Sequence, residues 1–172
     1  GEAVTIIGNA GINVLTGGNQ VDTITGGADA DTITGGAGAD TLSGGAGANV
    51  FQYGAGEFVT AETVTGGANA DTILFTADGQ TVVDAEFANK TFIEAITTKD
   101  GTNSITLGTL AAAATATLTV TGGTGADTID ASTLGEAVTI IGNAGSNVLT
   151  GGNQDDTITG GADADTITGG AG

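Results

Sequence analysis

Residues 8–52 read GNAGINVLT GGNQVDTIT GGADADTIT GGAGADTLS GGAGANVFQ, which are five consecutive nonapeptides built on one pattern. Numbered from the first glycine, the pattern is G-G-x-G-x-D-x-U-x, where U is a large apolar residue. Glycine permits tight turns and positive φ. The Thr-Ile-Thr segment that follows favours a three-residue strand whose middle side chain points inward. Each nonapeptide therefore predicts one turn and one strand, and such an internal repeat indicates a solenoid.

A longer repeat contains these nonapeptides. Residues 1–38 and 135–172 differ only at Ile12, which is replaced by Ser146, and at Val21, which is replaced by Asp155. The sequence therefore repeats with a period of 134 residues, and both ends lie inside a motif, so we expect a piece of a longer polypeptide. We divide the chain into a regular block at 1–53, a less regular β-helical segment at 54–134 with isolated nonapeptides at 66–74 and 122–130, and the start of a second copy at 135–172.

The irregular segment is expected to continue the same solenoid with longer coils, rather than to form a separate sandwich domain. Alternating Thr and Val predict further strands. The Ala-rich residues 110–117 could form one helical turn, but their β-branched neighbours favour a strand. All five Phe lie between Phe51 and Phe92, and with Tyr53 they predict a locally thicker core. The only two cations, Lys90 and Lys99, are each expected to be solvated near an acid such as Asp84, Glu86, Glu94 or Asp100.

The composition excludes several classes of function. The chain has 20 Asp and Glu against 2 Lys and Arg, which gives a formal charge of −18, and it has neither Cys nor His. So few cations argue against nucleic acid and anionic membranes as direct partners, and no apolar run is long enough to insert into a bilayer. Without Cys or His we expect no thiolate metal site and no enzyme. A divalent cation is the natural complement of the acidic side chains.

The acidic residue at position 6 recurs at a spacing that suits calcium. Two nonapeptides form one coil of 18 residues, so the residue 18 positions on lies beside it in the next coil. This spacing stacks Asn13 on Asp31, Asp22 on Asp40 and Asp31 on Asn49. Two such side chains with several loop carbonyls suit Ca²⁺, which takes about 6 to 8 oxygen ligands, better than Mg²⁺. The Asp22–Asp40 pair alone has two carboxylates in this block and is expected to bind most tightly.

These nonapeptides resemble the RTX family of hemolysin-type calcium-binding repeats over residues 8–52 and 142–172 and in the two isolated units. The resemblance implies an all-β fold, a right-handed parallel β-roll or β-helix that binds several Ca²⁺ ions between stacked loops. The ligands that it implies are Asp22, Asp31, Asp40, Asp71, Asp127, Asp156 and Asp165. Weaker candidates stand where the sequence departs from the motif: Asn13, Asn49, Asn147, Asp29 and Asp163.

A single coil buries too little apolar surface to offset the entropy of ordering its backbone, so we expect both calcium and neighbouring coils to be required. The near-identical long repeat favours a structural protein outside the cell or on its surface, and the resemblance implies a bacterial one. This protein would fold on Ca²⁺ after secretion, type I by resemblance, and stack with copies of itself into a rod, filament, surface layer or adhesin stalk. A cell-surface polysaccharide is a further candidate partner.

Two alternatives stay open at this point. The chain is then either a secretion and folding module of a larger secreted enzyme, toxin or adhesin, or a protein that binds ice or polysaccharide through Thr ladders. The ladders would begin at Thr23 with Thr25 and at Thr32 with Thr34. The spacing of 18 residues predicts that each ladder is short.

Overall fold

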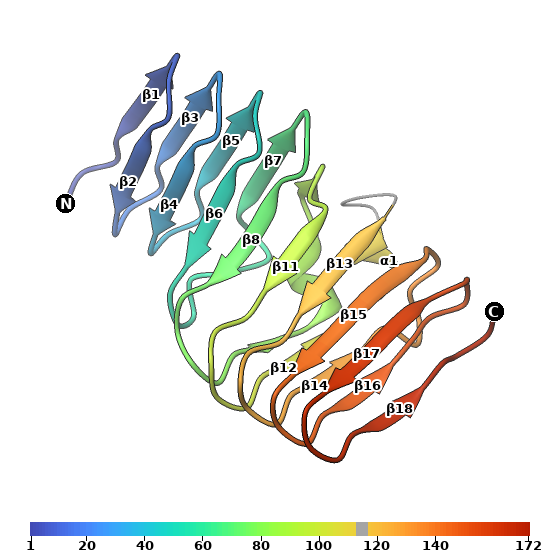
Figure 1. The fold of residues 1–172 in the computed structure, drawn as a ribbon. Helices are drawn as coiled ribbons and strands as arrows, with labels where there is room; N and C mark the ends of the chain where they lie inside the picture. Colours follow the sequence, from blue (N-terminus) through green and yellow to red (C-terminus); the bar gives the residue numbers. More distant parts are fainter. Residues whose placement is uncertain (113–116) are drawn as a thin grey trace.

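The computed structural model describes residues 1–112 and 117–172, which form a parallel β-solenoid. The chain winds from the N-terminus at one end of the stack to the C-terminus at the other, one coil upon the next (Figure 1). The predicted all-β solenoid is therefore confirmed. The division of the sequence into three segments stays a prediction.

Three parallel sheets run along the stack in the described residues. The long sheet, which extends through the whole stack, contains β2 (Val14–Gly18), β4 (Thr32–Gly36), β6 (Val50–Tyr53), β8 (Thr72–Phe75), β11 (Ala95–Thr97), β13 (Leu118–Thr121), β15 (Val138–Asn143) and β17 (Thr157–Gly161). The N-terminal sheet contains β1 (Thr5–Asn9), β3 (Thr23–Gly27), β5 (Thr41–Gly45), β7 (Thr63–Gly67) and β10 (Lys90–Thr91). The C-terminal sheet contains β9 (Thr81–Val82), β12 (Ser104–Thr106), β14 (Thr128–Asp130), β16 (Val148–Thr150) and β18 (Thr166–Thr168).

The repeat strands alternate as predicted, but they are longer than predicted. Ile24, Ile33 and Leu42 are buried between more exposed Thr or Ser neighbours, so the middle side chain of each strand forms the core. The expected three-residue strand is too short, because each strand continues through the first two glycines of the next nonapeptide. These glycines let coils stack closely, since a Cβ at Gly27 would collide with the main chain of Asn9.

The coil length changes along the stack. Thr5 pairs with Thr23 at the expected spacing of 18 residues, but Thr41 pairs with Thr63 at 22, and Ala95 pairs with Thr119 at 24. We call the coils longer than 18 residues wide coils. The wide coil between β8 and β11 contains both β10, the last strand of the N-terminal sheet, and β9, the first strand of the C-terminal sheet. The long sheet crosses this region without a break (Figure 1), so the solenoid continues instead of giving way to a sandwich.

Aromatic side chains fill the wide coils. The Phe58 ring packs against the rings of Tyr53, Phe75 and Phe87, with centroid distances of 5.0, 5.3 and 5.3 Å. This confirms the expected thicker core. Phe92 does not belong to it, because its side chain is 57% exposed and its backbone has a positive φ of 56°.

The prediction of a strand at residues 110–117 is wrong where the structure describes it. Residues Thr109–Ala112 form the short helix α1, and residues 113–116 lie outside the described residues. The physical reason is a carboxylate from another coil. Asp84, in the 3₁₀-helix η1 (Asp84–Phe87), accepts hydrogen bonds from the main-chain N–H groups of Gly108, Leu110 and Ala111. These N–H groups at a helix start otherwise lack partners.

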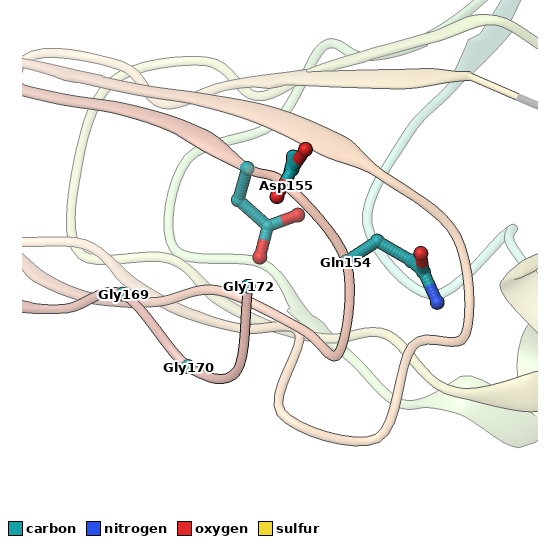
Figure 2. Close-up of a pocket in the computed structure, with 6 residues that line it drawn as sticks. Gln154, Asp155, Gly169, Gly170 and Gly172 are labelled. Atoms are coloured by element: carbon teal, nitrogen blue, oxygen red, sulfur yellow. The ribbon is translucent and has the colours of Figure 1, made fainter.

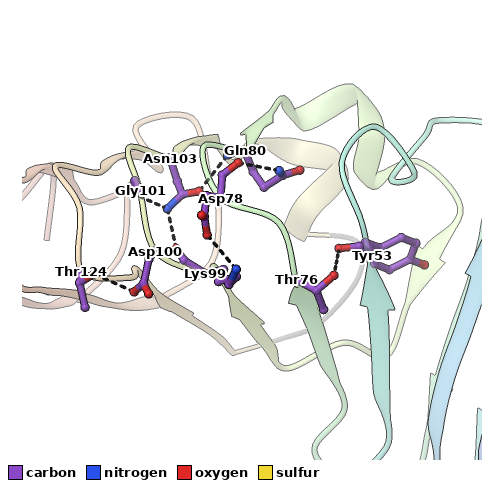
Figure 3. A network of polar contacts seen from close by, with 9 residues as sticks. All are labelled: Tyr53, Thr76, Asp78, Gln80, Lys99, Asp100, Gly101, Asn103 and Thr124. Atoms are coloured by element: carbon purple, nitrogen blue, oxygen red, sulfur yellow. Dashed lines mark hydrogen bonds and ion pairs between the residues drawn. The ribbon is translucent and has the colours of Figure 1, made fainter.

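The expectation of two solvated lysines holds only for Lys99, whose ammonium lies 3.2 Å from the Asp78 carboxylate at the surface (Figure 3). Lys90 is buried, because β10 aligns it with the inward residue Val64 of β7. Its Nζ donates to the main-chain carbonyls of Val59 and Glu62, at 2.6 and 3.0 Å, and lies 4.8 Å from the Phe58 ring centroid. Burial lowers the pKa of Lys90 to about 8.

Candidate metal centres

The position-6 side chains form columns along the stack. Asp31 Oδ1 accepts the main-chain N–H of Asn13 at 2.8 Å, and Asp40 Oδ1 accepts that of Asp22 at 2.8 Å. Asn49 Oδ1 accepts the N–H of Asp31 at 2.9 Å. The structure thus brings together the stacked pairs that the spacing of 18 residues predicts, and one carboxylate oxygen of each Asp is used to join coils.

The second carboxylate oxygen has no partner at four of the predicted positions. These Oδ2 atoms are buried and accept no hydrogen bond, although a buried anionic oxygen without a partner is costly. They belong to Asp22, Asp31, Asp40 and Asp71. Each of these loops therefore needs a positive group that the described side chains do not supply.

A carbonyl oxygen of the next coil lies beside several of these carboxylates. A Cβ added to Gly122 would lie 2.5 Å from Asp127 Oδ2 and 2.9 Å from the carbonyl oxygen of Gly142 in the next coil. The same pair of oxygens surrounds Gly17 and Gly26, the first glycines of their nonapeptides. Glycine keeps this space open, and carboxylate and carbonyl oxygens are the ligands that Ca²⁺ prefers. No group of three or more acidic side chains is placed to hold a metal in the described residues, so carbonyls would supply most ligands.

Asparagine at position 6 provides a hydrogen-bond donor of its own. Asn49 Nδ2 donates to the Gly47 carbonyl at 3.1 Å, and Asn147 Nδ2 donates to the Gly145 carbonyl at 2.9 Å. Asn103 likewise donates to the carbonyls of Lys99 and Gly101 (Figure 3). The carboxamide oxygen accepts a main-chain N–H from the neighbouring coil, and the carboxamide nitrogen donates to loop carbonyls. A carboxylate has no donor, so it leaves those carbonyls free. This favours weak or absent ion binding at the Asn loops, Asn13 included.

Exchanging Asp and Asn is expected to change the number of bound ions. Asn49→Asp replaces the donor with a carboxylate oxygen and is expected to add one ion at saturating Ca²⁺, and Asp31→Asn is expected to remove one. Native mass spectrometry or calorimetry measures this number. Asn19→Asp adds the same charge at an exposed loop position and is the control. Unchanged ion numbers in both exchanged variants would contradict this assignment.

The remaining predicted residues have other partners. Asp127 Oδ2 and Asp156 Oδ2 accept glycine N–H groups at 3.0 and 2.6 Å, and Asp165 Oδ1 accepts the N–H of Asn147. Asp29 and Asp163 are exposed, and each accepts a glycine N–H from the preceding coil at 3.0 Å. Their predicted roles toward a metal stay predictions.

The loops at the C-terminal end enclose a pocket. Its volume is about 240 Å³, and acidic side chains lie on one side with glycine main chain on the other (Figure 2). The pocket is lined by Gln154, Asp155, Asp156, Gly169, Gly170 and Gly172. It has the same combination of carboxylate and carbonyl groups as the buried loops.

The sequence analysis missed three residues that occupy position 6 in the wide coils. Glu94 Oε2 accepts the N–H of Asp71 at 2.8 Å, and Asn103 Oδ1 accepts the N–H of Gln80 at 2.9 Å. Glu62 immediately precedes β7, as Asp40 precedes β5. Their spacing from the preceding residue of the column is 22 or 23, so a search at 18 does not find them. The signal that could have found them is an acid or Asn directly before a short Thr- or Ser-containing strand.

Calcium-free stability is expected to depend on the protonation of Asp71. Burial raises the pKa of this carboxyl from 3.8 to about 6, so the folded state binds a proton more tightly than the unfolded chain. The resulting stabilisation is complete below about pH 4 and is lost as the pH rises through about 6, with an upper limit of about 3 kcal/mol. Thermal unfolding in calcium-free buffer at pH 4.5 and 7 measures it. Asp71→Asn should reduce the difference between the two pH values, and an unchanged difference would contradict the prediction.

Parallel coils whose stacked loops present buried carboxylate and carbonyl oxygens define a calcium-binding repeat solenoid. The family model of the RTX calcium-binding nonapeptide repeat matches four copies, at residues 5–33, 25–57, 119–133 and 141–172. These matches cover more than half of the chain, and the chain belongs to this family. Neither the curated proteins nor the solved structures give a match.

Membership implies Ca²⁺ binding by a structural repeat fold, of a kind typical of secreted bacterial proteins. Within the described residues, no helix has the length and hydropathy needed to cross a membrane.

Proposed function

We propose that this chain is a calcium-folded structural module of an extracellular rod, filament or surface layer. One observation carries the proposal. Four stacked loops each bury a carboxylate oxygen without a partner, in a chain of formal charge −18. The coils are therefore incomplete without cations, and they are suited to remain unfolded where calcium is scarce and to fold where it is abundant. The proposal assigns the chain no catalytic role.

The chain's own residues divide the work of folding. Bound Ca²⁺ would supply the positive charge that the loops lack. The Asp Oδ2 atoms and the glycine carbonyls would hold it, while the Asp Oδ1 atoms join successive coils. Ile24, Ile33 and Leu42 bury the apolar surface that the stacked coils share. Folding and ion binding are thus one process, in which mutual repulsion of the acids opposes stacking until cations offset it.

The junction between the two 134-residue copies supports end-to-end stacking. The second copy begins a new coil with β15 and β16, which stack in parallel register on β13 and β14 of the first copy. Leu118 pairs with Val138, and Thr128 pairs with Val148, so the junction is an ordinary step between coils. Exposed strand edges at the ends of such a stack are templates for further pairing. Successive copies would therefore lengthen the same rod.

Circular dichroism with Ca²⁺ and with EGTA, followed by electron microscopy, tests the proposal. We expect β structure to appear with Ca²⁺ and to be lost with EGTA, and we expect the calcium-loaded protein to form rods or lattices. Mg²⁺ at the same concentration is the control, since it demands a tighter octahedral site. No gain of β structure with Ca²⁺ would overturn the folding proposal. A calcium-folded monomer that never assembles would overturn the structural role and favour a secretion and folding module.

A second candidate, binding of ice or polysaccharide, gains support from one correction. The Thr ladder of the N-terminal sheet is longer than predicted, because the 22-residue coil places Thr63 and Thr65 beside Thr41 and Ser43. Neighbouring strands of the ladder are about 4.8 Å apart. The two rows consist of Thr5, Thr23, Thr41 and Thr63, and of Thr25, Ser43, Thr65 and Thr91. The ladder that begins at Thr32 on the long sheet does end, since Thr32 pairs with Val50.

Lysine at the centre of the longer ladder tests this candidate. Thr41→Lys should abolish adsorption to ice or to cell-surface polysaccharide, whereas Thr32→Lys on the long sheet, between Val14 and Val50, should not. Equal adsorption by the two variants would exclude a role for the ladder.

A further inference from the structure

We propose a further calcium site between Asp40, a motif aspartate, and Glu62, which lies outside every nonapeptide. Thr41 pairs with Thr63, and the N–H of Thr63 donates to the carbonyl oxygen of Asp40 at 2.9 Å. Asp40 and Glu62 immediately precede these residues and therefore stand in adjacent coils, about 4.8 Å apart along the stack. The motif spacing of 18 residues would instead place Phe58 beside Asp40.

Four oxygen atoms in this region are buried without a partner. They are Asp40 Oδ2, both carboxylate oxygens of Glu62 and the Tyr53 hydroxyl, and each of these residues is at most 1% exposed. Burying a carboxylate of which neither oxygen is hydrogen-bonded is among the most costly arrangements in a protein interior. A hard divalent cation is the ligand that carboxylate and neutral oxygens together accept.

The contacts of the intervening loop bring these groups together. Tyr53 ends β6, and the loop from residue 54 to 61 leads to Glu62 before β7 begins. The Tyr53 ring packs on Phe58, and burial raises the pKa of the Tyr53 hydroxyl, as do the nearby carboxylates of Glu62, Asp40 and Glu57. Glu57 Oε2 accepts the N–H of Gly54 at 2.6 Å, which holds the loop in place.

Lys90 does not take the place of the cation. Its Nζ donates to the main-chain carbonyls of Val59 and Glu62, and in the described part of the chain the ion pair within 4.0 Å is the one between Lys99 and Asp78. The charges that act on Lys90 are those of Glu62 and Glu86, so its ammonium group does not serve the Asp40 carboxylate. A divalent cation between Asp40 and Glu62 would supply the positive charge that is missing there.

The site would connect two differently built parts of the solenoid. Asp40 is the last position-6 Asp of the regular block. Glu62 lies in the next coil, where aromatic side chains form the core. The inference deepens the proposed function, because it adds an ion to the same calcium-dependent folding. Glu62 and Tyr53 are not ligands of any motif loop, so substitution of Glu62 tests this site separately.

Terbium luminescence tests the site, because the chain contains one Tyr and no Trp. Tb³⁺ replaces Ca²⁺, and its emission is sensitised only by a nearby aromatic donor, so excitation of tyrosine reports ions beside Tyr53. We expect sensitised emission that Ca²⁺ displaces. Glu62→Gln is expected to abolish this emission and to remove one Ca²⁺ in native mass spectrometry. Asp22→Asn should preserve the emission, and Glu136→Gln, at an exposed position, should change neither readout.

Two results would overturn the site. The first is absence of sensitised emission from the unsubstituted chain at saturating Tb³⁺, which requires no variant to fold. The second is retention of both the emission and the ion number by Glu62→Gln, with Glu62→Ala as the replacement if the glutamine variant does not fold. Either result leaves calcium-induced β structure intact and so spares the proposed function. Failure of that function would instead appear as no gain of β structure in the unsubstituted chain.

Discussion

Phe75→Ala is expected to lower the free energy of unfolding of the calcium-loaded protein by about 3 to 5 kcal/mol. Phe75 is fully buried, and its ring lies 5.3 Å from the Phe58 ring and 6.2 Å from the Tyr53 ring. The coils on both sides of β8 are held in register by main-chain hydrogen bonds, so the backbone cannot close the cavity that alanine leaves. Urea unfolding at saturating Ca²⁺, followed by circular dichroism, measures the loss.

Phe92→Ala is the matched control. Phe92 is the same residue type in the neighbouring coil, but its side chain is exposed. Its loss should therefore change stability by less than about 0.5 kcal/mol. Equal destabilisation by the two substitutions would contradict the assignment of Phe75, and not Phe92, to the core.

Gly26→Ala is expected to abolish ion binding at the Asp31 loop and to destabilise the fold. The added Cβ would overlap Asp31 Oδ2 and would lie 2.7 Å from the carbonyl oxygen of Gly44. Both atoms are candidate calcium ligands, and strand pairing prevents the two main chains from separating. The overlap alone should cost about 1 to 3 kcal/mol, and the loss of the ion adds to it. Calorimetric titration with Ca²⁺ and thermal unfolding measure the two effects.

Gly135→Ala provides the comparison for this prediction. A Cβ at Gly135 meets no atom within 4 Å, so the substitution should leave ion binding unchanged and keep or slightly raise stability. If Gly26→Ala binds as many ions as Gly135→Ala, the space above Gly26 is not part of a metal site.

Much of the fold follows from periodicity. A glycine pair, an acid and a Thr-Ile-Thr segment at intervals of nine residues leave few alternatives to a parallel coil, because the inward residue must meet its equivalent in the next coil. The stacking of Asp22 on Asp40 follows from the same interval. In the regular blocks, therefore, the spacing of 18 residues is enough to predict which residues pair.

The wide coils could not be predicted in this way. Glu62 and Glu94 occupy the motif position of Asp at spacings of 22 and 23 residues, and Lys90 occupies an inward apolar position. A charged inward residue is acceptable there because loop carbonyls bind the ammonium group and the Phe58 ring lies beside it. The helix α1 depends on Asp84, a residue more than 20 positions away. Local sequence does not contain these partners.

The nonapeptide sequence accordingly specifies a parallel solenoid, the period of its regular coils and the carboxylate that each loop presents. Only the folded stack decides which oxygens remain without a partner and which non-motif acids join the columns. The physical reason is that the neighbour in the next coil decides whether both carboxylate oxygens of an Asp have a partner. That neighbour is selected by strand register, which the sequence spacing reproduces only while the coil length stays constant.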